Sequence, residues 1–589
     1  MSEILSTLES TLKQDSRLTS SDGSLMKNQV QELARKTDEG LITLLLTSEA
    51  LKAHFFREIG KVQVFDKDRF IKFVSNKDFL PDSYTAFKNR IGLSTNSKYF
   101  AEDSNVVLAW PYKDCLLEGG MTKEDQKRDE VFYNEVLAPE DVHRLLEPKV
   151  FKNSGRYSDK GRTSVTTLNR DSAGVIRENL IIKGNNLLAL ASLRKEFAGR
   201  VKLIYIDPPY NTENGSFSYN DTFNHSTWLT YMKNRLELAK DLLSDTGSIY
   251  VNIDYNEIHY LKVLMDEVFG RQNFQREIIW RMGFVSGYKT AVNNFIRNHD
   301  TILFYSKHAP SLEFNKLYIQ NKDFNDLVPL SADIKKEFKK HGVSEETTKS
   351  LFEFINHSNR GERYPLEDTW NANKWDKLDS IAIESSTSQV GETVTIDDEN
   401  FKGQKPEKLI QRIIESSSNP GDIVLDFFLG SGTTAAAAHK LGRQYIGVEQ
   451  MDYITESIIP RLEGVIQGDK DGISAAVNWQ GGGEFVYLEL ASWNENWIEK
   501  IKSAATEESL YSIWIELQDS SFLSYKVDPK KVSEEIGQFV DLDIADKKRF
   551  LVEVLDKNFL YVNLKDINDQ QYEISESDRA LNKSFYRSK

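Results

Sequence analysis

The stretch from Val201 to Tyr210 constrains the fold more than any other part of the 589-residue chain. It begins with the apolar run Val-Lys-Leu-Ile-Tyr-Ile, which predicts a buried β-strand. The run stops at Asp207, and the stiff residues Pro208 and Pro209 follow directly. Ligands of open α/β sheets bind at the carboxyl ends of the strands. We therefore expect a sheet strand whose end carries a functional site.

The tetrapeptide Asp207 to Tyr210 offers a carboxylate, the backbone carbonyl of Pro208 and an aromatic ring. Two acceptors can take the two hydrogens of an exocyclic amine, and a ring can stack on the planar base that carries it. A second interpretation is an ordinary proline turn after a strand, with Asp207 as a helix cap. Short motifs recur by chance, so this stretch alone leaves both interpretations open.

A second strand pattern, Ile423 to Asp426, runs into a glycine turn with the sequence Phe-Phe-Leu-Gly-Ser-Gly. Glycines let a backbone approach a ligand closely, and the helix predicted to follow supplies free amide donors at its start. The next short strand, Gln444 to Glu449, also ends in an acid. In dinucleotide-binding folds an acid at this place accepts hydrogen bonds from ribose hydroxyls. The third glycine of a nicotinamide or flavin site is missing, which argues against those cofactors.

Together these motifs resemble the amino-methyltransferases of DNA that use S-adenosylmethionine. The tetrapeptide precedes the cofactor loop in the chain, which is similar to the β-class permutation of that family. Further segments resemble the modification subunit of type III restriction–modification systems: Asn179–Leu188, Tyr219–Phe223 with Trp228, Gly403–Leu409 and Ser575–Tyr586. The resemblance covers most of the chain from about Asp159 onward and is weaker before that point and in the middle insert.

The alternation of strand and helix patterns from Glu178 predicts a mainly parallel sheet with helices on both faces. The resemblance implies an α/β fold with a permuted Rossmann-like methyltransferase sheet. It also implies an inserted target-recognition domain. Apolar residues at helical spacing predict a mostly helical N-terminal region, and the sequence pattern of the last part of the chain predicts a small α+β C-terminal domain. The expected boundaries are 1–150 for the helical region, 151–280 for the catalytic half of the core, 281–378 for the insert, 379–482 for the cofactor half, and 483–589 for the C-terminal domain.

The resemblance also implies roles for individual residues. The catalytic residues would be Asp207, Pro208, Pro209 and Tyr210, and the target base would stack on Tyr210 and Tyr219. The cofactor would be held by Asp207, Asp426, Phe428, Gly430, Ser431, Gly432, Thr433, Glu449, Gly184, Asn185 and Lys405. For Asn185 a helix N-cap is an alternative role, and the Lys405 segment also suits an ordinary helix start with proline at the first position. No metal ligands are expected.

The activity implied is methyl transfer from S-adenosylmethionine to the N6 amine of an adenine flipped out of double-stranded DNA. Asp rather than Ser at position 207 favours adenine N6 over cytosine N4 in this resemblance. The implied partners are DNA, a second copy of the chain and a separate helicase and nuclease restriction subunit, since no helicase phosphate loop is found. Three alternatives stay open: a cytosine-N4 DNA methyltransferase, a catalytically silent DNA-binding specificity subunit, and a methyltransferase of protein or RNA.

Composition bounds these expectations. Hydrophobic residues make up 39% of the chain, which supports large cores rather than disorder. The single cysteine, Cys115, excludes an intrachain disulfide and a multi-cysteine zinc site. No secretory pattern opens the sequence and no apolar run is long enough to span a membrane, so a cytoplasmic protein is expected.

The net charge of −15 weighs against strong non-specific DNA binding, because phosphate contacts supply most of that affinity. Basic residues nevertheless gather in two stretches, from Arg156 to Arg170 and from Arg271 to Lys307. We expect a local basic face between acidic outer regions. Ordinary solvated surface charge is the alternative interpretation.

Overall fold

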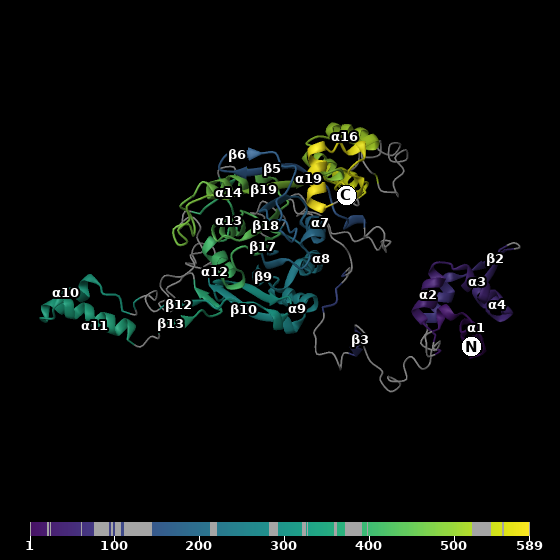
Figure 1. The fold of residues 1–589 in the computed structure, drawn as a ribbon, viewed down its shortest axis with the longest axis horizontal. Helices are drawn as coiled ribbons and strands as arrows, with labels where there is room; N and C mark the ends of the chain where they lie inside the picture. Colours follow the sequence, from purple (N-terminus) through teal and green to yellow (C-terminus); the bar gives the residue numbers. More distant parts are fainter. Residues whose placement is uncertain are drawn as a thin grey trace. The chain divides into compact units, whose positions relative to one another are not determined.

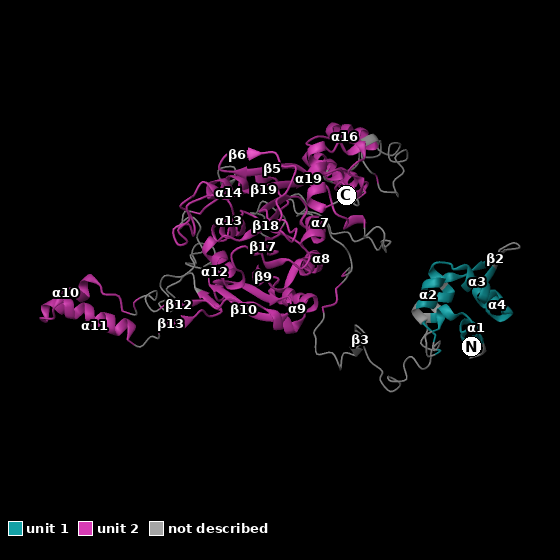
Figure 2. Ribbon diagram, in the orientation of Figure 1, with its two compact units in different colours: residues 1–104 teal, residues 105–589 magenta. Residues whose placement is uncertain are grey.

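The computed structural model divides into two compact units, residues 1–104 and 105–589 (Figure 2). It describes residues 2–19, 23, 25–59, 62–75, 94–95, 98–99, 108–110, 113, 144–212, 221–281, 293–320, 326, 328–358, 362–371, 392–396, 399–520, 523, 543–556 and 559–587. Cys115 lies outside these ranges.

The first unit is built mainly of short helices around a small apolar core. Its elements are α1 (Ser2–Leu12), α2 (Lys27–Arg35), α3 (Glu39–Leu46), α4 (Glu49–Phe55), β1 (Phe56–Ile59), β2 (Val62–Phe65), α5 (Lys67–Ser75), β3 (Ser94–Thr95) and β4 (Lys98–Tyr99). Leu41, Leu45 and Leu51, which recur at helical spacing, are fully buried. The antiparallel β1–β2 hairpin interrupts the helical pattern.

One eleven-stranded sheet organises the second unit (Figure 1). The strand order is β14-β10-β11-β9-β8-β17-β18-β7-β19-β5-β6. The strands are β5 (Phe151–Ser158), β6 (Gly161–Thr163), β7 (Leu180–Lys183), β8 (Val201–Ile206), β9 (Leu243–Ile253), β10 (Phe274–Arg281), β11 (His299–Ser306), β14 (Thr369–Asn371), β17 (Ile423–Asp426), β18 (Gln444–Glu449) and β19 (Phe485–Leu490). The six strands from β9 to β19 in this order are parallel to one another.

Helices cover both faces of the sheet. One face carries α7 (Asn186–Phe197), α8 (His225–Leu242) and α9 (Ile258–Phe269), and the other carries α12 (Glu407–Ser417), α13 (Thr433–Lys440) and α14 (Ile458–Ile466). Side chains alternate between the two cores: Leu180 and Ile182 belong to the first, Ile181 to the second. The buried parallel strands explain the near-continuous apolar runs in the sequence. The predicted α/β class is confirmed.

The sheet interleaves two distant parts of the chain. Strand β17 pairs with β8 on one side and with β18 on the other, and β18 in turn pairs with β7. The strand before Asp207 and the strand ending at Asp426 are therefore neighbours. Because the two run parallel, their carboxyl ends meet at the same edge of the sheet. This arrangement confirms the permuted order.

The central sheet extends across several of the expected domain boundaries. Strands β11 and β14 belong to it although both fall inside the range 281–378 expected as an insert. Strand β19, expected in the C-terminal domain, pairs in parallel with β7. The helices that follow share the core of the sheet's first face: α15 (Asn494–Ser503), α16 (Glu507–Ser520), α18 (Ile544–Glu553) and α19 (Glu576–Tyr586). Asn582 ties α19 to β5 by hydrogen bonds to both the N–H and the carbonyl of Phe151.

Residues 307–368 hold the described part of the insert that lies outside the large sheet. They contain a two-stranded sheet, β12 (Tyr318–Gln320) with β13 (Arg363–Pro365). They also contain α10 (Ala332–Lys340) and α11 (Glu345–His357), whose N-termini are capped by Ser331 and Ser344. The rings of Phe338 and Phe352 join these two helices edge to face. A further small hairpin joins β15 (Thr395–Ile396) to β16 (Glu399–Asn400).

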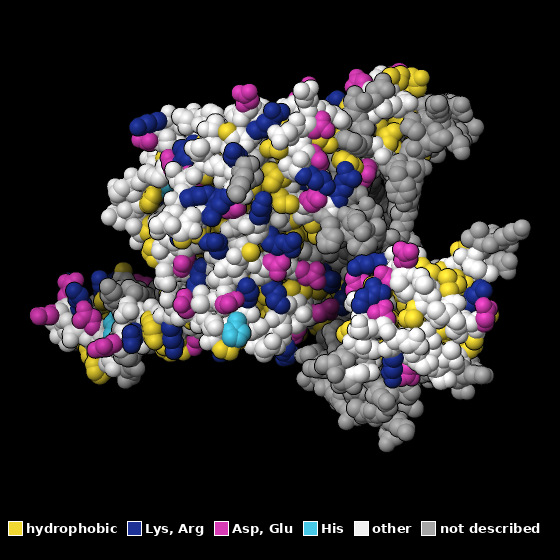
Figure 3. Space-filling model, turned by 45° about the vertical axis from the view of Figure 1, so that its right-hand side comes forward, with side chains coloured by type: hydrophobic (Ala, Val, Ile, Leu, Met, Phe, Trp, Pro, Cys, Tyr) yellow, Lys and Arg dark blue, Asp and Glu magenta, His cyan; other side chains and the backbone are white. Residues whose placement is uncertain are grey.

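Many basic residues that predicted a DNA-facing surface are paired with acids. Arg156 contacts Glu178 and Glu484, and Arg170 contacts Glu196 at 2.9 Å. On the face drawn in Figure 3, basic and acidic side chains are interspersed. The side chains of these two arginines are less than one-fifth exposed, so they are neither part of an open basic face nor solvated surface charge. Among the described residues no helix has the length and apolarity to cross a bilayer, and no cluster of side chains suits a metal ion.

Candidate active site

Three parallel strands end at one cavity. Asp207 follows β8, Asp426 ends β17 and Glu449 ends β18, and all three side chains line a cavity of about 780 Å³, counting the space that opens to solvent. The cavity lies at the carboxyl edge of the sheet, where the β8–β17 pairing brings the two halves of the chain together.

The glycine loop after β17 is held by the Asp426 carboxylate. Its Oδ1 accepts the N–H of Phe428 at 2.9 Å and its Oδ2 accepts the hydroxyl of Thr434 at 2.6 Å. Gly432 has a φ of +81° and caps α13. A Cβ there would lie 3.2 Å from Ile458, so the glycine serves close helix packing. Gly432 itself does not line the cavity.

Glu449, at the end of β18, holds the other side of the glycine loop by hydrogen bonds to backbone N–H groups. Its Oε2 accepts the N–H of Gly430 at 2.8 Å, and its Oε1 accepts the N–H groups of Gln450 and Met451 at 2.9 and 3.0 Å. Burial raises the pKa of Glu449 above its ordinary value. A carboxylate fixed by three backbone donors at a strand end still has lone pairs that can accept from a ligand's hydroxyls.

The Asp207 tetrapeptide is fixed by its neighbours in the sheet. The amide of Asn252, on β9, donates to Oδ1 of Asp207 at 3.1 Å and also contacts the hydroxyl of Tyr210. Trp228 donates its indole N–H to the carbonyl of Pro209 at 2.9 Å. Oδ2 of Asp207 accepts from the ammonium of Lys405 at 2.6 Å.

The Tyr210 ring stands between this carboxylate and a second acid. Its hydroxyl donates to Oδ2 of Asp300 at 3.4 Å, and Asp300 is paired with Arg297. Burial and the charges of Asp207 and Asp300 hold the pKa of Tyr210 well above its ordinary range. The hydroxyl therefore stays protonated, and the ring offers a neutral stacking surface.

The turn after Tyr210 is held by buried polar contacts. Asn211, at a φ of +60°, donates its N–H to Asp221 at 2.7 Å and its amide to Glu257 at 2.6 Å. Burial raises the pKa of both acids. Tyr219, predicted to contact the target base, lies outside the described residues.

The two residues predicted to bind the cofactor in the turn after β7 lie outside the cavity lining. Neither Gly184 nor Asn185 lines the cavity among the described residues. Asn185 caps α7 by accepting from Leu187 at 3.0 Å, as the alternative interpretation had it. A Cβ on Gly184 would lie 2.8 Å from Leu490, so this glycine permits close packing. The next residue, Asn186, reaches the cavity wall and donates to the carbonyl of Phe427 at 3.0 Å.

Most other predicted cofactor residues do line the cavity: Asp207, Lys405, Asp426, Phe428, Gly430, Ser431, Thr433 and Glu449. Nothing in the sequence predicts a cofactor contact for five further lining residues: Tyr231, Phe401, Gln450, Met451 and Tyr453. Phe401 and Tyr453 meet edge to face with ring centroids 5.3 Å apart. The strand-end acid at 449 could have pointed to Gln450 and Met451, but nothing local marks Phe401.

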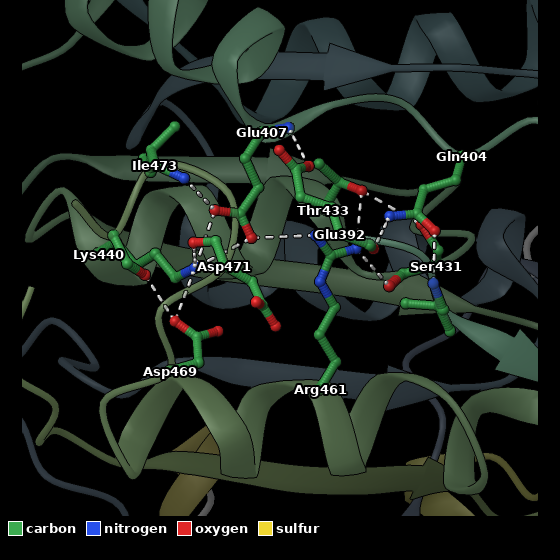
Figure 4. A network of polar contacts seen from close by, with 12 residues as sticks. Glu392, Gln404, Glu407, Ser431, Thr433, Lys440, Arg461, Asp469, Asp471 and Ile473 are labelled. Atoms are coloured by element: carbon green, nitrogen blue, oxygen red, sulfur yellow. Dashed lines mark hydrogen bonds and ion pairs between the residues drawn. The ribbon is translucent and has the colours of Figure 1, made fainter. Parts of the chain in front are cut away.

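A network of buried charges supports the glycine loop (Figure 4). Arg461 donates to the carbonyl of Ser431 at 3.1 Å and to the hydroxyl of Thr433 at 2.9 Å. Its other guanidinium nitrogen lies 3.0 Å from Oε1 of Glu407. Lys440, whose side chain is fully buried, contacts Glu407 at 2.9 Å. The network thus links α12, α13 and α14 to the cavity wall.

We expect Asp426→Asn to remove a pH-dependent loss of stability. Burial raises the pKa of Asp426 from 3.8 to about 7. A raised pKa means that the protonated form fits the folded state better, so this contribution is fully present below about pH 4 and is lost as the pH rises through 7. Denaturant titrations measure the free energy of unfolding of the wild type and of Asp426→Asn. The value for the wild type minus the value for the variant should decrease as the pH rises from about 4 to 7. A constant difference would contradict the assignment.

Comparisons with known proteins agree with this site. A family model described as DNA methylase matches residues 201–460, and one described as type III restriction/modification enzyme methylation subunit matches residues 38–93. The chain is 35% identical to the probable type III restriction-modification enzyme HindVI Mod subunit of Haemophilus influenzae, over 96% of this chain and 95% of that protein. It is 30% identical to the type II methyltransferase M.EcaI of Enterobacter cloacae, over 49% and 70%. It is 28% identical to the EcoP15I Mod subunit of Escherichia coli, over 34% of each.

The fold, the strand-end acids and the first family model together define a DNA methylase. The chain belongs to the family of type III restriction–modification Mod subunits, as the similarity over nearly its whole length shows.

The methyl donor of DNA methylases is S-adenosylmethionine, and the residues of the cavity fit it. The strand-end carboxylate of Glu449 suits ribose hydroxyls, and the glycine loop lets the backbone approach a ligand closely. Aromatic walls from Phe401, Phe428 and Tyr453 suit the planar adenine and the methyl-sulfonium part of the cofactor. The cavity therefore has the mixed polar and apolar character that such a cofactor needs.

Proposed function

We propose that this protein transfers a methyl group from S-adenosylmethionine to the N6 amine of an adenine flipped out of double-stranded DNA. One observation carries the proposal: the Asp207 carboxylate lines the cofactor cavity, and Asn252 and Lys405 each contact both this carboxylate and Tyr210. A base reaches such a site only outside the duplex. The family match supports DNA as the substrate.

The chain's own residues contribute positioning and electrostatics. The lone pair of an exocyclic amine is delocalised into the base, so the amine is a weak nucleophile. Asp207 and the Pro208 carbonyl would accept its two hydrogens and orient the lone pair away from the ring, while Tyr210 holds the base by stacking. When bound, the cofactor supplies the methyl group. In the same proposal Glu449 binds the ribose, and the loop from Asp426 to Thr433 binds the sugar and the methionine part.

The proposal includes partners. Relatives named as Mod subunits support a role as the modification and specificity subunit beside a separate restriction subunit. Two copies of the chain would form the DNA-binding assembly, and the reaction would take place in the cytoplasm, where the host DNA lies. Size-exclusion chromatography with light scattering measures the copy number, and co-purification from the native host tests for the restriction subunit.

Expression in a host without adenine methylation tests the activity. Single-molecule sequencing of the host DNA should show N6-methyladenine at one short sequence, and none with Asp207→Ala. N4-methylcytosine at a defined sequence would favour the cytosine alternative. The absence of any modified base, with intact binding of S-adenosylhomocysteine, would contradict the proposal.

Glu449→Ala should weaken binding of S-adenosylhomocysteine at least about tenfold, because it removes the ribose acceptor and leaves three backbone donors without their partner. Isothermal titration calorimetry measures this affinity. Glu456→Ala is the matched control, since Glu456 is exposed and does not line the cavity. Equal affinities of the two variants would remove Glu449 from the cofactor site.

A further inference from the structure

The ammonium of Lys405 lies against the two groups that the proposed reaction needs for its target base. Its Nζ is 2.6 Å from Oδ2 of Asp207 and 5.0 Å from the centroid of the Tyr210 ring. The side chains of Lys405 and Asp207 are only 11% and 20% exposed. A charge-assisted hydrogen bond and a cation–π contact therefore hold the lysine in a largely enclosed position.

These are the interactions expected of an adenine amine. The Lys405 ammonium and an adenine amine would each donate an N–H to the Asp207 carboxylate beside the Tyr210 ring. A base stacked on that ring face would need the space that the ammonium occupies. The lysine is thus an internal mimic of the amine donor, and base and lysine compete for one place.

We propose that Lys405 occupies the target-base position until a flipped base displaces it, so that the lysine lowers the affinity for every base that enters this position. The inference rests on the proposed function, since it takes Asp207 and Tyr210 as the base site. A base that enters must break the contacts of the lysine with Asp207 and Tyr210, whether or not it carries an amine. An adenine then regains a hydrogen bond to Asp207 through its own amine, and a base without the amine does not.

The local structure lets the side chain move while its backbone stays fixed. The carbonyl of Lys405 accepts the hydroxyl of Thr433 at 3.0 Å, and Pro406 follows. The preceding Gln404 is buried and hydrogen-bonded to Glu392 and Val394. A lysine carries its charge on a flexible four-carbon stem, so the exchange requires only side-chain rotation. The carbonyl of Gly403, already 3.3 Å from Nζ, offers another acceptor.

The test compares wild type with Lys405→Met on two DNA duplexes that contain the mapped recognition sequence. One carries adenine at the target position, and the other carries purine, which lacks the amine. Both are unpaired at that position, so that flipping costs little. Fluorescence anisotropy at saturating S-adenosylhomocysteine measures the dissociation constants. Lys470→Met, an exposed lysine that does not line the cavity, corrects for the loss of one positive charge.

We expect Lys405→Met to bind both duplexes about tenfold more tightly than the Lys470→Met control does, because no lysine has to be displaced. The preference for adenine over purine, about tenfold in the wild type, should stay unchanged, since the lysine is displaced in both complexes. A thermal unfolding transition of Lys405→Met close to that of the wild type shows that the variant is folded, and its own affinity for S-adenosylhomocysteine sets the saturating concentration.

A folded Lys405→Met that binds both duplexes no more tightly than the control would overturn the inference. So would tighter binding of only one of the two duplexes. Neither result touches the proposed function, which is tested by methylation of DNA by the wild type. If the wild type methylates no DNA, the proposed function fails whatever the binding data show.

Discussion

Asp207→Ala should lower kcat for methyl transfer to DNA by at least about 10²–10³-fold. The side chain is placed by Asn252 and stands at the cavity wall, where it would accept one hydrogen of the target amine. Removing it takes away both an oriented acceptor and a negative charge beside a reaction that develops positive charge on the amine. Because the ribose and glycine-loop contacts remain, the affinity for S-adenosylhomocysteine should change far less than kcat does.

A graded series separates the charge from the hydrogen bond. Asp207→Asn keeps an acceptor oxygen without the charge, and its kcat should fall between those of wild type and Asp207→Ala. Asp245→Ala is the control, because Asp245 is an exposed acid on β9 at the far end of the strand from Asn252. Rapid-quench measurement of single turnovers reports the chemical step. An Asp207→Ala enzyme with wild-type single-turnover rates would remove Asp207 from the catalytic residues.

Glu407→Ala should destabilise the larger unit by about 3–5 kcal/mol. The change leaves the buried guanidinium of Arg461 without its carboxylate, while Lys440 loses one of its two acids and keeps Asp469 at 3.0 Å. Burial of an unpaired charge costs far more than the loss of a surface ion pair. Arg461 also holds Ser431 and Thr433, so we expect weaker cofactor binding as well.

Thermal unfolding followed by fluorescence measures this effect. Glu337→Ala is the control: Glu337 pairs with Lys340 on the surface of α10, where both side chains are more than half exposed, and its loss should change the unfolding free energy by less than about 1 kcal/mol. A Glu407→Ala protein as stable as the control would show that the network contributes specificity rather than stability.

The sequence predicted the strand-end acids because each ends an apolar run. Asp207, Asp426 and Glu449 can be found by pattern alone, and parallel pairing brings them to one edge. In the turn after β7 the same reasoning predicted that Asn185 binds the cofactor. In the structure Asn185 caps α7, and its neighbour Asn186 lines the cavity. Only the start of α7 decides which of two neighbouring asparagines points inward.

Other parts of the site depend on contacts between distant segments. Lys405 meets Asp207 across 198 positions, and Asn252 meets it across 45. Glu407 is linked to Arg461 across 54 positions. No local pattern predicts such pairs, because a charged residue in a sequence is normally predicted to be exposed to solvent. The boundaries of the expected insert differ for the same reason, because β11 and β14 pair with strands far from them in the chain.

The most direct test of the central claim uses S-adenosylmethionine labelled in its methyl group and unmethylated genomic DNA. After incubation with the wild type, nucleosides are released and identified by mass. We predict labelled N6-methyl-2′-deoxyadenosine with the wild type and none with Asp207→Ala. Label in N4-methylcytosine, or no label in DNA from an enzyme that binds S-adenosylhomocysteine, would contradict the account.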